Sequence, residues 1–299
     1  MANSTIENTY GGGVADATVS PSKLSVDFGG FNRNRVVNGN FVIWQRGDTI
    51  STPNNASCTA DRWLVSYDGT IGTFSISRQD HTVGQTTVEG DPIHFLRWNQ
   101  TTSGSGSSLR RITQRIENVA TFAAKTLHIT FYAKADTTRT VSLSVIQNFG
   151  SGGSTAVETS AGSVNLTTSW QKFTTNVAVP STSGKTVGAN NFVSVGFNLP
   201  INVTFTFDVS QVQVELGGHS PFEIEDIGDT QIKCLRYYQV APTRIRTDMS
   251  TIPFKGVMRA APTLAGGGTG FTAGLLTEHG ATAYQTTEAD QTITLDAEL

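Results

Sequence analysis

Hydrophobic and polar positions alternate with a period of two through most of the chain, from about residue 34 to residue 219. In Leu127–Ala133 the apolar residues occupy every second position, and the runs Val141–Val145 and Val193–Leu199 repeat the pattern. Stretches rich in glycine, serine and proline separate these runs, and segments with helical spacing are nearly absent. Many short alternating strands joined by such turns are typical of stacked antiparallel sheets. The pattern predicts an all-β fold, a jelly-roll-like β-sandwich over residues 34–219.

The last run of the predicted sandwich changes parity part-way along. In Phe205–Val209 the apolar residues are odd-numbered, whereas in Val212–Leu216 they are even-numbered. A strand with regular pairing through this change would turn one apolar set toward water. A β-bulge absorbs one residue and avoids this, so the sequence predicts a bulge near Ser210 and Gln211.

The segment before the sandwich has a different character. Residues 1–33 are polar and glycine-rich, and only Leu24, Val26 and Phe28 alternate with polar neighbours. This patch is too small to form a core, so the segment is either a disordered tail or an extended arm that pairs with another subunit. The arm is the sharper hypothesis, and in it these three residues anchor the chain to a larger particle.

Residues 220–299 are predicted to form one short helix and a small C-terminal β extension. Asp229 would be the N-cap of a helix over about 229–239, and its apolar face would hold Ile227, Cys234, Leu235 and Tyr238. The best strand candidates beyond the helix are Phe254, Met258–Thr263 and Thr292–Leu299. Because large apolar residues are scarce in this extension, we do not expect it to form a stable core alone.

Composition and charge narrow the functional classes. Charged residues make up 15% of the 299 residues, the formal net charge is -3, and lysine and arginine do not cluster along the chain. Such a chain disfavours nucleic acid as a partner. No signal-peptide pattern and no run of about twenty apolar residues occurs, so membrane insertion is not expected. Cys58 and Cys234 are too few for a disulfide scaffold, and two free buried thiols are favoured over one long-range bridge.

Catalytic patterns are weak in this sequence. No two of the five histidines have metal-ligand spacing, and no nucleophile elbow or phosphate-binding loop occurs. Two close sets of carboxylates, Glu89 with Asp91 and the run Glu223–Asp226, could in principle serve glycoside hydrolysis. Both sets lie near glycine or proline in predicted loops. We therefore expect a protein that is not an enzyme and that needs no cofactor.

Sugar binding is the stronger prediction from the side chains. Sugar-binding β-sandwiches place aromatic rings against pyranose faces and use amide, carboxylate and guanidinium groups for hydrogen bonds. The aromatic candidates are Tyr67, Trp98, Tyr132 and Trp170, whereas Trp44 and Trp63 are expected in the core. Trp98 is flanked by Arg97 and Asn99 and is the tryptophan least expected to be buried. The predicted carbohydrate-binding residues are Trp98, Arg97, Asn99 and Tyr67.

Several segments resemble those of a known group of proteins. Val36–Gly47 followed by Thr59–Trp63 is similar to the first strand of galactose-binding-like β-sandwich domains in bacteriophage structural proteins. Phe205–Gly217 resembles the last strand of those sandwiches. The other segments that recur in that family are Pro221–Gln239, Met258–Thr263 and Ala297–Leu299. The resemblance covers about 34–299 and leaves only the arm unexplained.

The resemblance implies an exposed structural component of a phage virion, assembled in the host cytoplasm: a tail or head fibre, or a decoration protein. Its expected partners are other virion proteins, contacted through residues 1–33, and host-surface glycans. The alternative is an adsorption module, similar to carbohydrate-binding modules, that recognises host polysaccharide. A glycan depolymerase is the least favoured function, because no carboxylate pair with a defined separation can be identified.

The resemblance also implies a metal site and an oligomeric state. Related sugar modules often hold a structural Ca²⁺ near the first and last strands, where Asn40 and Asp208 match the oxygen ligands. Val42 stands where an acidic residue is common, so the site would be weak. By analogy with phage fibres we expect a homotrimer in which Thr292–Leu295 buries its apolar residues against neighbouring chains. The alternative is a monomer whose extension folds back on its own sandwich.

Overall fold

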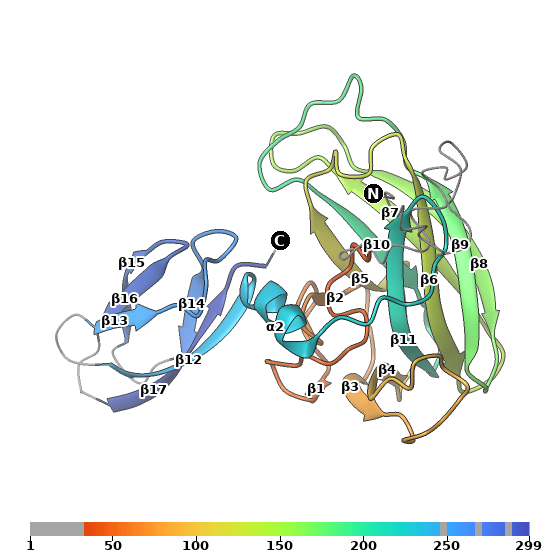
Figure 1. Ribbon diagram of the computed structural model, residues 1–299, viewed down its shortest axis with the longest axis horizontal. Coiled ribbons are helices and arrows are strands. Elements are labelled where there is room, and N and C mark those ends of the chain that lie inside the picture. Colours follow the sequence, from red (N-terminus) through yellow and green to blue (C-terminus); the bar gives the residue numbers. More distant parts are fainter. Residues whose placement is uncertain (1–32, 246–249, 267–270, 285–288, 299) are drawn as a thin grey trace, which may run out of the picture.

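The structure is a computed structural model that describes residues 33–245, 250–266, 271–284 and 289–298. Almost all regular structure in these ranges is β-strand, and a single helix accompanies it there, which confirms the predicted all-β class. A sandwich, the helix α2 and an extension follow one another along the chain, and the extension projects from one side of the sandwich (Figure 1). The predicted arm residues lie outside the described ranges: Leu24, Val26 and Phe28.

Two antiparallel sheets stack to form the sandwich (Figure 1). The first sheet has the order β1-β3-β4-β11-β6-β9, with the bounds β1 Thr49–Ser51, β3 Phe74–Asp80, β4 His94–Gln100, β6 Thr126–Ala135, β9 Gln171–Ala178 and β11 Phe205–Leu216. The second has the order β2-β5-β10-β7-β8, with the bounds β2 Trp63–Tyr67, β5 Arg110–Glu117, β7 Arg139–Asn148, β8 Val157–Leu166 and β10 Phe192–Asn198. Strands distant in sequence pair in both sheets, which gives the predicted jelly-roll-like arrangement.

Inward-facing residues of the long strands fill the space between the two sheets. Trp63 and Trp98 are almost fully buried there, among phenylalanine, valine, leucine and isoleucine side chains. Within β6, every apolar residue of the alternating run Leu127–Ala133 has no exposed surface. Trp44 belongs to the same core, so the prediction that Trp44 and Trp63 are core residues is confirmed.

The predicted β-bulge is present in β11. The pairing register with β6 shifts between Ser210 and Gln213, and Gln211 adopts a positive φ of 49°. The apolar residues on both sides of the shift face the core, and all but Leu216 are nearly fully buried. The bulge therefore lets one long strand line the core despite its change of parity.

The turn at Asn38-Gly39 docks against this bulge. Asn38 has a φ of 59°, and its side-chain amide donates to Ile43 O at 2.9 Å and to Asp61 O at 3.1 Å. The carbonyl of Gly39 accepts from Val212 N at 2.8 Å. A Cβ at position 39 would lie 2.1 Å from Val212 O, so only glycine fits there. Close packing against β11, as well as turn geometry, therefore requires this Asn-Gly pair.

The helix lies closer to the N-terminus than the sequence predicts. α2 spans Ile227–Leu235, and Asp226 is its N-cap, because the Asp226 side chain accepts from Gly228 N at 2.7 Å. The predicted cap, Asp229, lies instead in the first turn, where its negative charge favours the helix dipole. The signal in the sequence for the true start is Asp226, three residues before the predicted cap, because an aspartate side chain can accept from the backbone N–H two residues later.

α2 ends early because the chain passes directly into the extension. Tyr238 opens the first strand of the extension and pairs with Asp296, so it cannot continue the helix. Of the predicted apolar face, Cys234 is buried, whereas Ile227 is 55% exposed. Tyr238 is also buried, but in β12 rather than in the helix, so the predicted apolar helix face is wrong at Ile227 and Tyr238 and right at Cys234.

The extension consists of two three-stranded antiparallel sheets, β12-β17-β14 and β13-β16-β15. Their bounds are β12 Tyr238–Ile245, β13 Ser250–Pro253, β14 Thr263–Gly266, β15 Thr272–Leu276, β16 Gly280–Tyr284 and β17 Ala289–Asp296. Met258, Ile293 and Leu295 are at most 1% exposed within this one chain. The expectation that Ile293 and Leu295 are buried by neighbouring chains is therefore wrong, because alanine-rich sheets of the same extension cover them.

Two further expectations concern the thiols and the membrane. Cys58 and Cys234 are both buried and both free, as predicted. Within the described ranges, no helix has the length and apolar character needed to cross a bilayer.

Candidate functional site

Trp98, the predicted sugar platform, lies inside the sandwich. It has no exposed surface, and its ring stacks on Phe74 with the centroids 4.6 Å apart. Its indole N–H donates to Gln100 Oε1 at 3.1 Å. Trp98 shares the inward face of β4 with Leu96, so its polar sequence neighbours point the other way. A ring enclosed in this manner cannot contact a sugar, and the prediction of a platform at Trp98 is wrong.

The other predicted sugar-binding residues do not converge on one place. Arg97 and Asn99 lie on the outer face of β4, opposite to the face that carries Trp98. Tyr67 lies in β2 of the other sheet, where its hydroxyl donates to Pro53 O at 3.0 Å. These residues therefore form no common site.

Asp208, predicted as a calcium ligand, is already held by cations. Two hydrogen bonds of 2.7 Å join Arg97 to its carboxylate, and Lys134 Nζ lies 3.6 Å from it. Asn40 lines a different region, beside Phe222. Among the described residues, no group of three or more histidine, cysteine, aspartate or glutamate side chains could hold a metal ion. Asn40 and Asp208 therefore do not fit a calcium ion, which prefers several free oxygen ligands.

The outer face of the six-stranded sheet carries an aromatic cluster that is satisfied internally. The half-buried Trp170 lies 5.0 Å from the rings of His81 and Phe95, and Lys134 Nζ lies 5.1 Å from the Trp170 ring centroid. Burial lowers the pKa of His81 to about 4, and Ser210 Oγ lies 3.1 Å from its Nε2. Protein side chains therefore occupy the ring surfaces that a sugar would need.

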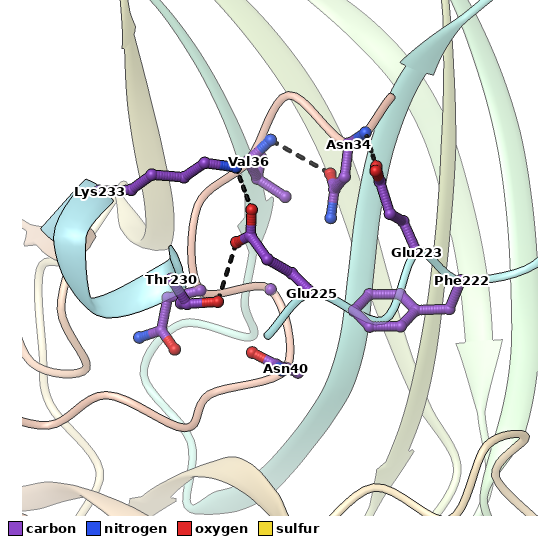
Figure 2. A pocket seen from close by; sticks show the side chains of 10 residues that line it. Asn34, Val36, Asn40, Phe222, Glu223, Glu225, Thr230 and Lys233 are labelled. Carbon is purple, nitrogen blue, oxygen red and sulfur yellow. Dashed lines mark hydrogen bonds and ion pairs between the residues drawn. The ribbon is translucent and has the colours of Figure 1, made fainter. Parts of the chain in front are cut away.

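Two carboxylates line a small cavity between the first described residues and α2 (Figure 2). Glu223 Oε2 accepts from Asn34 N at 2.7 Å, whereas Glu225 accepts from Thr230 Oγ1 at 2.8 Å and pairs with Lys233. The cavity measures about 20 Å³, which is room for about one water molecule. Glu223 and Glu225 therefore fasten neighbouring segments to the sandwich and leave no space for a substrate.

An open groove of about 510 Å³ lies on the outer face of the five-stranded sheet. One row of polar side chains crosses it: Arg111 of β5, Asn198 of β10, Ser142 of β7 and Ser163 of β8. Strand register places these residues directly opposite one another, since Arg111 pairs with Asn198, Asn198 with Ser142, and Ser142 with Ser163. At about 4.8 Å between strands, the row extends for ~14 Å.

Hydrogen bonds hold one end of this row in place. Arg111 Nε donates to Asn198 Oδ1 at 2.5 Å, and Arg111 Nη2 pairs with Glu158 Oε1 at 2.6 Å. Asn198 Nδ2 donates to Ser144 Oγ at 3.3 Å. Leu109 adds an apolar surface at the rim. A fixed row of hydroxyl, amide and guanidinium groups beside an apolar rim can form directional hydrogen bonds with a polyhydroxyl ligand.

Sequence reasoning missed this row because its members look like ordinary solvent-facing strand residues. Ser142, Ser163 and Asn198 are far apart in sequence, and Ser142 and Asn198 each alternate with buried apolar neighbours. Strand order alone brings them together, because β10 lies between β5 and β7. The one local signal is that the outward positions of β7 and β8 are mostly serine, threonine and asparagine rather than charged residues.

Comparison with known proteins gives distant structural neighbours. No family model matches the chain, and no curated protein sequence matches it. Tailspike protein 4 of bacteriophage CBA120, in its enzymatically active domain, is 17% identical over 62% of this chain, with a TM-score of 0.39, and the chain spans 21% of that protein. A CBM4 structure is 20% identical, with coverages of 60% and 97% and a TM-score of 0.36. TmCBM61, solved with β-1,4-galactotriose, is 12% identical, with coverages of 62% and 99% and a TM-score of 0.34.

The neighbours are thus carbohydrate-binding β-sandwiches and a phage tailspike domain. Their identities and TM-scores are too low to carry an argument about what this chain binds.

Proposed function

We propose that the sandwich binds a glycan in the groove on the five-stranded sheet. The observation that supports this most directly is the aligned row of Arg111, Asn198, Ser142 and Ser163. Paired strands carry all four residues, so binding a saccharide would cost little additional conformational entropy in the protein. Neutral hydroxyl and amide groups dominate the row, which suits a sugar better than a peptide or an apolar ligand.

The proposed module is non-catalytic. Glycoside hydrolysis commonly uses two carboxylates about 5–10 Å apart on either side of the scissile bond. The carboxylate beside the groove, Glu158, is paired with Arg111. Of the carboxylates that the sequence suggests, Glu89 pairs with Lys172 at 2.8 Å on the other sheet, and the pair beside α2 holds the chain together.

A glycan array probed with the purified protein tests the groove. Replacing Asn198 by Ala removes the central hydrogen-bonding group of the row and should weaken binding to any glycan found by about tenfold, the cost of one to two hydrogen bonds. Asn176→Ala is the matched control, because Asn176 is exposed on β9 of the other sheet. Equal binding by both variants, or an array without any bound glycan, contradicts the proposal.

A second proposal places the chain on the exposed surface of a bacteriophage virion, where glycan binding would serve adsorption to the host. Sequence resemblance supports it, and the resembling segments come together in space. Arg46 lies over the Tyr238 ring at 3.6 Å and Arg62 over the Tyr237 ring at 3.3 Å. Both arginines also pair with Glu298. The segments that resemble the phage family thus contact one another in the folded chain. Such contacts are expected if the segments belong to one shared architecture.

In this second proposal, residues 1–33 attach the chain to the particle through Leu24, Val26 and Phe28. Deleting residues 2–33 should leave a folded, soluble protein that no longer enters virions, which immunoblots of purified particles would measure. Incorporation at the normal level contradicts the anchoring role. Image reconstruction of the intact particle would locate the protein on tail, neck or capsid.

The homotrimer also stays a prediction. Light scattering on the full-length chain should give three times the chain mass of 31.9 kDa. A monomer mass at micromolar concentration contradicts oligomerisation, and a dimer contradicts the stoichiometry alone.

A further inference from the structure

A second hollow, of about 280 Å³, lies where the sandwich meets α2 and the extension. Its walls come from the residues before the Asn-Gly turn, the residue before β2, strand β5 and the residues after α2. Four arginines line it: Arg35, Arg62, Arg115 and Arg236. The arginine pocket, as we call this hollow, is therefore unlike the rest of a chain whose formal net charge is -3.

Negative charge in the arginine pocket is scarce. Among the described residues that line it, Glu117 is the one carboxylate, and it is engaged by Arg236 at 3.1 Å and by the Tyr237 hydroxyl at 2.7 Å. Arg62 pairs with Glu298, which lies outside the lining. Four guanidinium groups therefore line the pocket, and two carboxylates, Glu117 and Glu298, pair with two of them, so the net charge around the pocket is positive and an additional anion would be favoured there.

The burial of two of these arginines adds to the positive potential. Arg62 is 1% exposed, its guanidinium lies 3.3 Å from the Tyr237 ring centroid, and among the described residues its buried Nε has no hydrogen-bond partner. Burial lowers the pKa of Arg115, although this group stays charged at neutral pH. A buried donor without a partner is costly, and the positive charge of Arg62 in the pocket wall would attract an incoming oxyanion.

The arginine pocket and the groove lie on one face of one strand. Arg111, which lines the groove, and Arg115, which lines the pocket, are four residues apart on the outer face of β5. At about 3.3 Å per residue, ~13 Å separates them along the strand. The residues of β10 opposite this stretch are Ser194 and Gly196, so small side chains cover the path between the two hollows.

We propose that the arginine pocket binds the oxyanion of an acidic sugar, a uronate carboxylate or a sulfate ester, on a glycan whose other residues lie in the groove. This inference rests on the proposed glycan-binding function and adds the class of glycan: an acidic polysaccharide. Arginine suits the role, because its planar fork donates two parallel hydrogen bonds to a carboxylate or sulfate. Arg35, which is exposed at the mouth of the pocket, would make first contact with the anion.

The test compares three probes by calorimetry: oligogalacturonate, its fully methyl-esterified neutral form, and a sulfated heparin oligosaccharide. At least one acidic probe should bind about tenfold more tightly than the neutral one, and raising the salt concentration should reduce this advantage. Arg35→Gln should remove most of the advantage without changing the affinity for the neutral probe. Arg78→Gln is the matched control, since Arg78 lies on β3 of the other sheet, in an ion pair with Asp48.

The two proposals fail in different ways. Equal affinity for acidic and neutral probes, with sensitivity to Asn198→Ala, overturns the arginine pocket and leaves the groove. Acidic binding that depends on Arg35 but not on Asn198 overturns the groove and leaves an independent oxyanion site. If no probe binds, both proposals are overturned for these glycan classes. If only the sulfated probe binds with the expected dependence, the oxyanion is a sulfate ester and the uronate is excluded.

Discussion

The core of the sandwich and its junction with the extension are held together by opposite kinds of chemistry. Between the sheets, Trp63, Trp98 and Phe131 lie in a nearly continuous apolar volume. At the junction, by contrast, arginines stack on tyrosines and pair with carboxylates, as in the contacts of Arg46 and Arg62. Hydrophobic burial depends little on pH or salt, whereas the second kind of contact depends on both.

This difference indicates which region of the protein should respond to a change in pH or salt concentration. The core fixes the sheets and hence the groove, and only loss of apolar volume should disturb it. The contacts at the junction determine how firmly the extension is attached and how positive the electrostatic potential in the arginine pocket is. Solution conditions should therefore act on the junction first and on the core last.

The largest expected effect is the loss of a core tryptophan. Trp63→Ala should lower the free energy of unfolding by about 3–5 kcal/mol, because a buried indole that is 1% exposed is replaced by a cavity. Thermal and urea unfolding measure this. Trp170→Ala, on the outer face of the other sheet, is the matched control and should cost clearly less. If both variants lost the same free energy of unfolding, the proposed difference between core and surface aromatic residues would be wrong.

The next effect concerns the junction itself. Glu298→Gln removes the carboxylate that pairs with the buried Arg62, and an uncompensated buried charge should cost about 3 kcal/mol. Limited proteolysis should then release the extension before the sandwich is cut. Glu89→Gln, which breaks the exposed pair with Lys172, is the control and should cost less than about 1 kcal/mol. Proteolysis patterns identical to that of the natural chain would show that the ion pairs do not hold the extension.

Acid should weaken the sandwich through its outer face rather than through its core. Burial depresses the pKa of His81 from 6.5 to about 4, so the unfolded state binds a proton first as pH falls. The stability contributed by neutral His81 is complete above pH 6.5 and decreases toward pH 4, by about 3 kcal/mol. His81→Gln should flatten this slope, and the exposed His279→Gln should not. If the slope of stability against pH is unchanged in His81→Gln, other groups cause the acid sensitivity.

The smallest expected effect is the pH dependence of stability that Asp61 causes at the junction, and its sign is opposite to that of His81. Burial raises the pKa of Asp61 from 3.8 to about 6, so unfolded Asp61 ionises first as pH rises. Ionisation of Asp61 should therefore reduce stability between pH 3.8 and 6, by about 2–3 kcal/mol, in the window where His81 increases it. Asp61→Asn should make the rise of stability with pH steeper, measured by urea unfolding at pH 4, 5 and 6. A shallower rise would contradict the raised pKa.

Much of the fold can be predicted from the period-two pattern, because burial decides which face of a strand is apolar. The run Leu127–Ala133 and the bulge near Gln211 were predicted correctly on this basis. The same rule applied to β4 places Trp98 on the inward side with Leu96. The polar neighbours Arg97 and Asn99 suggest an exposed ring, but they lie on the opposite face of the strand and do not affect the burial of Trp98.

The candidate site could not be predicted from the sequence, because it depends on strand order. Arg111, Asn198 and Ser142 meet only because β10 pairs with both β5 and β7, which no local pattern encodes. The core of the extension was missed for a different reason. Ala281 and Ala283 are buried there, and counting large apolar residues ignores the close sheet packing that alanine allows.

The docking of the Asn-Gly turn against the bulge of β11 has a consequence for the making of the protein. Gly39 O of the turn accepts from Val212 N at 2.8 Å, and the nearby Asn34 Nδ2 donates to Val212 O at 3.0 Å across 178 residues of sequence. At a synthesis rate of about 5–20 residues per second, the ribosome needs roughly 10–35 s to supply that partner. During this interval Phe41 and Trp44, both core residues, have no completed sheet to cover them. The part of the sandwich that is translated first is therefore among the last to reach its place.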